Sequence, residues 1–123
     1  MKTQKALEDY LESMLIVKEK HGFIRSIDIA AELGVTKPSV SYATKKLRES
    51  GFITMERDGL ITLTDAGMKI AECTYDRHKR LMEFFMRLGV EESTARADAC
   101  KIEHDISAET FKALCEYVDK TMK

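Results

Sequence analysis

The sequence has little of several features that typify secreted or membrane-spanning proteins. It contains three cysteines, an odd number with no compact disulfide framework, and a single proline. Its longest apolar run covers only residues 14–17, far too short to span a membrane. The first residues contain no apolar segment or small-residue cleavage site of a secretory signal. We therefore expect a cytoplasmic protein with free thiols and no membrane partner.

The sequence also has no excess of charge of one sign. Twenty Lys and Arg residues stand against 21 Asp and Glu, a formal net charge of −1. This excludes a uniformly basic surface, so nucleic-acid binding does not follow from the total charge. With 123 residues, 44% of them hydrophobic, the chain can bury a real core. It is too short for a large α/β barrel or a two-domain enzyme of ordinary size.

Residue spacing predicts a helix over residues 4–20, followed by two short helices joined by a tight turn. Ser26 is the expected N-cap of the first short helix, with Ile27 on its buried face, and Gly34 closes it. Thr36 is the expected N-cap of the next helix. Two such helices around a glycine turn form a helix-turn-helix.

Two β-prone runs follow, at residues 52–56 and 60–64, with Asp58-Gly59 between them as a hairpin signal. A helix-turn-helix followed by a hairpin is the order of a winged helix.

The rest of the chain predicts helices over residues 65–88, 91–105 and 107–122. The expected fold is mainly α. We divide it into a winged helix-turn-helix domain over residues 1–72 and a helical dimerisation domain over residues 73–123.

The near-zero net charge hides an uneven distribution. Residues 35–57 carry a net charge of +3, and residues 71–123 carry −2. The start of a recognition helix meets base edges, whereas later basic residues and a basic wing suit phosphates. An ordinary solvated helix face is the alternative. The positions predicted to face DNA are Thr36, Lys37, Pro38, Ser39, Ser41, Tyr42, Lys45, Lys46 and Arg57.

A set of carboxylate, imidazole and thiol side chains indicates a metal site. Three of them lie at i, i+3 and i+4 on one predicted helix, and two at i, i+3 on the first helix. Such mixed ligands suit Mn²⁺, Fe²⁺, Co²⁺ or Zn²⁺, and six side chains are enough for two adjacent ions. The candidate ligands are Asp9, Glu12, His78, Cys100, Glu103 and His104.

Each candidate ligand has an ordinary structural alternative. The first-helix pair, Asp9 and Glu12, could complement a helix dipole. His78 stands among basic residues and could be a surface residue, and Cys100 could be a small buried hydrophobe. Glu103 and His104 could be a solvated pair. The other two cysteines, Cys73 and Cys115, are interpreted as core residues.

With these motifs in place, nearly the whole chain resembles the DtxR/MntR family of metal-dependent transcriptional repressors. The resemblance implies a homodimer that binds a palindromic operator when loaded with Mn²⁺ or Fe²⁺ and represses metal-uptake genes. The motifs that carry it are Glu8-Asp9-Tyr10-Leu11-x-x-Met14, Thr36-Lys37-Pro38-Ser39-Val40-Ser41, Gly59-Leu60-x-x-Leu63-Thr64-x-x-Gly67, Arg77-His78 and Cys100-x-x-Glu103-His104.

The ligand set is a hybrid of the two branches of this family. Asp9 resembles the manganese branch, where the iron branch carries Met, and Cys100 resembles the iron branch, where the manganese branch carries Glu. Met82 and Arg96 stand where an ancillary site of the iron branch needs Glu and His. The oxygen ligands favour Mn²⁺ and the thiol favours Fe²⁺ or a softer ion, with Co²⁺ or Zn²⁺ as substitutes.

Two other function classes are compatible with part of the sequence. A winged-helix regulator could respond to an organic ligand, which would make the candidate metal ligands incidental. A small di-metal enzyme could use six ligands, but the sequence has no phosphate loop and no nucleophile–base order. We expect no enzymatic activity and no small organic substrate.

Overall fold

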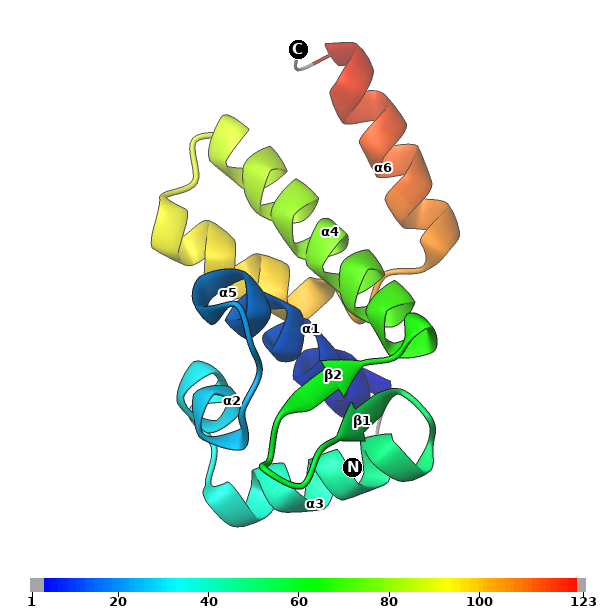
Figure 1. Cartoon of the computed structure of the whole chain (residues 1–123). Coiled ribbons are helices and arrows are strands. Elements are labelled where there is room, and N and C mark those ends of the chain that lie inside the picture. Colours follow the sequence, from blue (N-terminus) through cyan, green and yellow to red (C-terminus); the bar gives the residue numbers. More distant parts are fainter. Residues whose placement is uncertain (1–3, 122–123) are drawn as a thin grey trace. The chain divides into compact units, whose positions relative to one another are not determined.

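The computed structural model describes residues 4–121, most of them helical (Figure 1). The chain divides into two compact units, with the boundary between Cys73 and Thr74. The elements are α1 (Gln4–His21), α2 (Ser26–Leu33), α3 (Lys37–Glu49), β1 (Ile53–Met55), β2 (Ile61–Leu63), α4 (Asp65–Arg87), α5 (Glu92–Ile102) and α6 (Ala108–Thr121). A winged helix-turn-helix followed by helices confirms the predicted mainly α fold.

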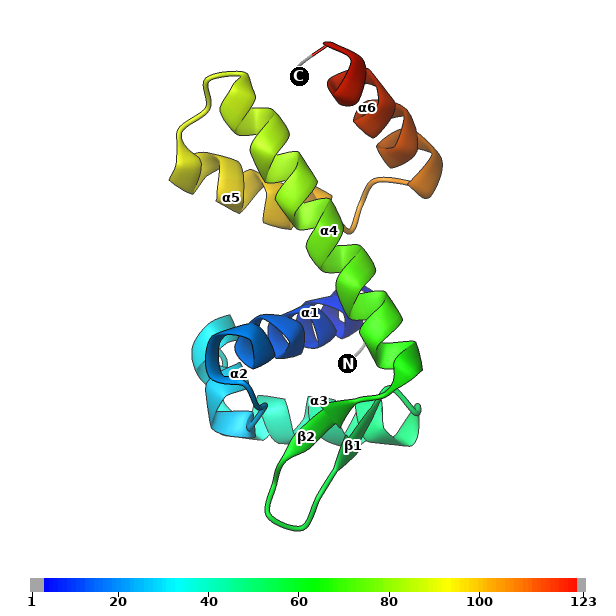
Figure 2. The same ribbon diagram turned by 45° about the horizontal axis from the view of Figure 1, so that its top comes forward.

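In the first unit, α1, α2 and α3 pack against one another and β1 packs on α3. The two strands form an antiparallel hairpin with Ile53 opposite Leu63 (Figure 2). Burial of apolar side chains removes them from water and stabilises this arrangement. The buried core residues are Leu11, Met14, Val17, Ile24, Ile29, Val40, Leu47, Ile53, Ile61, Leu63 and Ala71.

The predicted turn chemistry is confirmed at two positions. Gly34 ends α2 in the left-handed conformation with φ of 67°, which costs a glycine little. Thr36 caps α3, because its Oγ1 accepts a hydrogen bond from the Ser39 amide at 3.3 Å. These two short-range features fix where the recognition helix α3 begins.

The prediction for the start of α2 was wrong. Ser26 is already helical and the N-cap is Arg25, whose extended backbone carbonyl accepts bonds from the Asp28 and Ile29 amides. Ile27 is 61% exposed because it lies two residues, about 200° around the helix, from the buried Ile29.

Each strand has three residues rather than the five predicted. The wing tip leaves the ladder early, since the Gly59 amide bonds the Glu56 carbonyl in a turn. On the other side of β2, the Ile61 amide bonds the Ile24 carbonyl at 3.0 Å. Arg25, next to Ile24, donates to the Asp58 carbonyl at 2.8 Å and so ties the wing tip to the start of α2.

The second unit contains the C-terminal part of α4 together with α5 and α6 (Figure 2). The helix predicted over residues 91–105 ends at Ile102, which corrects the prediction. The Asp105 amide bonds the Ile102 carbonyl, so the chain tightens into a turn after α5. The last helix matches its prediction as far as Thr121, and Met122 lies outside the described residues.

The last helix buries none of its residues within the chain, although Phe111, Leu114, Cys115 and Val118 form an apolar stripe. Cys115 is therefore only partly buried, and Cys73 is exposed, so the prediction that both are core residues was wrong. Cys73 lies on α4 beside the buried Thr74, one position away from the buried face. Among the described residues, no helix is both long and apolar enough to cross a membrane.

Gly67 provides a stability test of the first unit. A Cβ atom at this helical position would overlap the Phe52 backbone carbonyl, which cannot move aside as a flexible side chain could. Helix propensity alone predicts that Gly67→Ala stabilises α4. We expect instead a loss of about 3 kcal/mol from overpacking, measured by urea unfolding followed by circular dichroism.

The matched control is Gly34→Asn, because nothing lies within 4 Å of the added Cβ and Asn tolerates the left-handed conformation. A Gly67→Ala protein as stable as the wild type would contradict the close approach of α4 to the chain at Phe52.

Candidate metal centre and nucleic-acid interface

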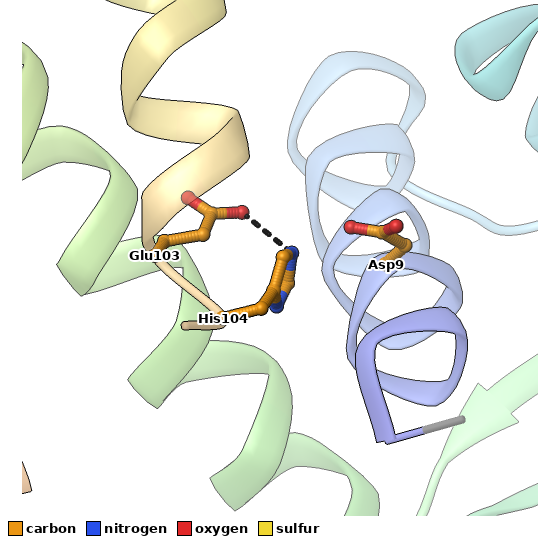
Figure 3. A group of neighbouring side chains, drawn as sticks. All are labelled: Asp9, Glu103 and His104. Atoms are coloured by element: carbon orange, nitrogen blue, oxygen red, sulfur yellow. Dashed lines mark ion pairs between the residues drawn. The ribbon is translucent and has the colours of Figure 1, made fainter. Parts of the chain in front are cut away.

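The most buried charged side chain of the second unit is Glu103, directly after α5, with an exposed fraction of 0%. Its Oε2 lies 3.0 Å from Nδ1 of His78 on α4. Its Oε1 lies 3.1 Å from Nε2 of His104, the next residue (Figure 3). One buried carboxylate thus stands between two imidazoles.

This arrangement depends on the end of α5. Glu103 still has helical dihedral angles, and its amide bonds the Ala99 carbonyl. His104 lies in the turn beyond the helix, as Figure 3 shows, so the two side chains do not share a helical face as predicted. The tightened turn instead allows neighbouring residues to face each other.

The donor set of this cluster fits a divalent transition metal. A buried carboxylate is costly unless a positive charge or metal pairs with it. Two imidazole nitrogens and carboxylate oxygens are ligands that Mn²⁺, Fe²⁺ and Zn²⁺ accept. Within the second unit, His78, Glu103 and His104 are therefore the side chains that could hold a metal.

The remaining predicted ligands belong to the helices α1 and α5. Asp9 and Glu12 stand one turn apart on α1 of the first unit, where Glu12 is buried with 8% exposure. Figure 3 also labels Asp9 on that helix. Cys100 on α5 is exposed, and its sulfur joins no group of three neighbouring metal-binding atoms in the part of the chain that the structure describes. The ligand roles of these residues stay predictions.

All nine residues predicted to face DNA are exposed, from Thr36 to Lys46 on and before α3 and at Arg57 in the wing. The opposite side of α3 is buried through Val40, Ala43 and Leu47. The helix thus separates a core face from an accessible polar face. This face can approach a nucleic acid without unfolding of the domain.

Three of the basic residues predicted to face DNA differ in their surroundings. The Lys46 ammonium lies 3.8 Å from a Glu49 carboxylate and 5.6 Å from the centre of the Tyr42 ring. Lys45 and Arg57 make no ion pair among the residues from 4 to 121. A phosphate has to compete with Glu49 for Lys46, but not for the other two.

Comparison with known proteins decides the family. Residues 2–60 match the family model described as the iron dependent repressor, N-terminal DNA binding domain. Residues 64–123 match the iron dependent repressor, metal binding and dimerisation domain. The chain belongs to the iron-dependent (DtxR/MntR) repressor family. This confirms the resemblance inferred from the motifs, and members of this family are metal-dependent transcriptional repressors rather than enzymes.

Individual relatives cover most of this repressor. It is 35% identical to an uncharacterised HTH-type transcriptional regulator of Methanocaldococcus jannaschii, over 94% of both chains. It is also 35% identical to the transcriptional regulator MntR of Salmonella typhimurium, over 93% of this chain and 73% of the relative. A manganese-dependent transcriptional repressor solved in complex with manganese matches with a TM-score of 0.79 at 26% identity. That match covers 93% of this chain and 51% of the solved chain, so this chain spans about half the length of the solved protein.

Sequence reasoning missed two residues that position these surfaces in the repressor. Arg25 reaches the wing tip, and Arg77 reaches carbonyls in the turn after α5. Each contact joins residues more than 25 positions apart. No local pattern could reveal them, although Arg77 stood within a family motif.

The cap of the recognition helix is open to a direct test. Thr36→Ala removes the side-chain oxygen that accepts from the Ser39 amide, so the start of α3 should fray. We expect a loss of about 1 kcal/mol in the free energy of unfolding, measured by urea titration. Thr94→Ala on the exposed side of α5 is the control and should change little. Equal stability of Thr36→Ala and the wild type would argue against the cap.

Proposed function

We propose that this protein is a cytoplasmic, metal-activated repressor that binds a palindromic operator as a homodimer and controls metal-uptake genes. Mn²⁺ or Fe²⁺ is the activating ion, and Co²⁺ or Zn²⁺ can substitute. The observation that carries the proposal is the buried Glu103 carboxylate between His78 and His104, in a chain whose first unit is a DNA-binding domain.

The proposed ligands come from both halves of the chain. The helical half supplies His78, Glu103 and His104. The DNA-binding half supplies Asp9 and Glu12. Carboxylates brought together without a cation repel each other, whereas a bound divalent ion attracts them all and so replaces the repulsion with a net attraction. The ion therefore favours states in which the two halves are held together, and six ligands including Cys100 are enough for two ions per subunit.

Dimerisation supplies the second half of the reading surface. One recognition unit carries only +3 over residues 35–57, a modest charge for phosphate binding. Two units read two half-sites about one DNA turn apart, roughly 34–36 Å. The metal acts as effector by selecting dimers with that spacing, to the extent that it binds them more tightly. The apolar stripe of α6, which the single chain leaves unburied, supports a partner for the helical unit.

Metal activation is tested with Glu103→Gln, which keeps the shape of the side chain and removes its charge. We expect Glu103→Gln to lower the Mn²⁺-dependent affinity for DNA at least about 100-fold. Loss of a metal ligand should weaken metal binding at least as much as loss of a residue that supports a ligand. The measurement is fluorescence anisotropy on a palindromic duplex selected from a random library by the Mn²⁺-loaded wild-type protein.

The matched control is Glu116→Gln, an exposed glutamate on α6, which should bind as the wild type does. Sedimentation should show the same dimer for both variants. Wild-type affinity that is equal with and without Mn²⁺, Fe²⁺, Co²⁺ or Zn²⁺ would instead favour a winged-helix regulator of another ligand.

Phosphate contacts are tested with Lys45→Ala and Arg57→Ala. Each should weaken binding to all duplex sequences alike and lower the slope of log affinity against log salt by about 1 per subunit. Lys112→Ala on the exposed side of α6 serves as the charge-matched control. A salt slope that is unchanged by Lys45→Ala or Arg57→Ala would remove that residue from the interface.

A further inference from the structure

We propose that Arg77 is a positioning residue that holds the ligand-bearing turn after α5 in its metal-binding conformation. The inference rests on the proposed function, because it assigns Glu103 and His104 to the metal. It concerns residues of the second unit only.

The first observation is the hydrogen bonding of the Arg77 guanidinium. Its Nη1 donates to the Glu103 carbonyl at 3.3 Å and to the Ile106 carbonyl at 3.4 Å. These two carbonyls flank the residues that lead from α5 to α6. A chain that leaves a helix exposes carbonyls that have no partner within the helix. One side chain from α4 satisfies both ends of this turn.

The second observation is the packing of the same side chain. The Arg77 guanidinium carbon lies 5.5 Å from the centre of the Phe111 ring on α6, and Arg77 Nε is buried. The guanidinium therefore lies within cation–π distance of an aromatic ring on α6 while it bonds the turn.

The third observation is the position of Arg77 next to a proposed ligand. Arg77 holds the main-chain carbonyl of Glu103, and the adjacent His78 contacts the carboxylate of the same residue at 3.0 Å. Neighbouring residues on α4 thus fix both the backbone and the side chain of Glu103. His104 follows Glu103 directly, so its backbone is fixed by the same contacts.

Charge repulsion and positioning predict opposite effects of removing Arg77 on metal affinity. A cation close to a metal site repels the metal, so removal of Arg77 would then tighten metal binding. Positioning predicts weaker binding, because supporting residues of metal ligands typically contribute 10–100-fold in affinity. The sign of the change decides between the two.

The test uses Arg77→Gln, Arg77→Lys and the control Arg80→Gln in the full chain. Arg80 lies one turn from Arg77 and also joins α4 to α6, through an ion pair with Asp119 at 3.1 Å, but among the described residues no ion pair links it to the turn. It therefore reports a general loosening of the helical unit. Free Mn²⁺ is measured by electron paramagnetic resonance during titration, and hydrogen exchange of amides 103–107 is measured in the metal-free protein.

We expect Arg77→Gln to raise the dissociation constant for Mn²⁺ about 10-fold and to speed exchange in residues 103–107. Arg77→Lys should lie between this variant and the wild type, since an ammonium can reach a carbonyl but lacks the planar fork. Arg80→Gln should match the wild type in both measurements.

Unchanged exchange in Arg77→Gln would overturn the positioning role, and so would Mn²⁺ affinity that is equal to or tighter than that of the wild type. A wild-type protein that binds none of Mn²⁺, Fe²⁺, Co²⁺ and Zn²⁺ would overturn the proposed function and with it the link to metal. That failure is distinguishable, because the exchange measurement needs no metal.

Discussion

A carboxylate removed from water constrains the second unit of this protein. Glu103 has no exposed surface, and its two oxygens face two imidazoles at 3.0 and 3.1 Å. An isolated charge is costly at such a position, and the pairing offsets this cost only with good geometry. Nδ1 of His78 lies at hydrogen-bond distance from Oε2, whereas the buried Oε1, which accepts no hydrogen bond among the described residues, faces Nε2 of His104. The helix α5 ends at Ile102, one residue before Glu103, and the chain then tightens into a turn. Arg77 donates a hydrogen bond to the Glu103 carbonyl in that turn.

The same constraint explains how a small ion could control a larger rearrangement. A site with only His78, Glu103 and His104 is incomplete for an ion that prefers six ligands. In the proposed mechanism the missing ligands come from α1 of the DNA-binding unit, so full coordination and the docking of α1 are one event. Its coupling energy equals the preference of the ion for the complete site over the incomplete one. A site that lay wholly within one unit would bind metal without changing the reading surface.

The sequence predicted those parts of the fold that depend on nearby residues. Gly34 and Thr36 fix the helix-turn-helix through contacts within a few positions, and both predictions are confirmed. The end of α5 could not be predicted from nearby residues, and the turn that follows it is hydrogen-bonded by Arg77, 26 positions away from Glu103. The candidate ligands follow from residue types with suitable spacing, and their roles stay predictions. Cys100, Glu103 and His104 were expected on one helical face, whereas the structure places His104 in the turn beyond the helix.

The balance of charge follows the same division. The basic excess of +3 lies over residues 35–57, on the exposed face of α3 and in the wing, and the acidic excess lies in residues 71–123. Glu103, one of those acidic residues, is fully buried and therefore contributes little to the surface. One bound divalent cation would offset two of the three negative charges of Glu103 and the proposed α1 ligands Asp9 and Glu12. In the proposed metal-bound dimer, the field that DNA meets is then set by two basic faces rather than by the net charge of −1, which is why total charge is a poor guide to DNA binding.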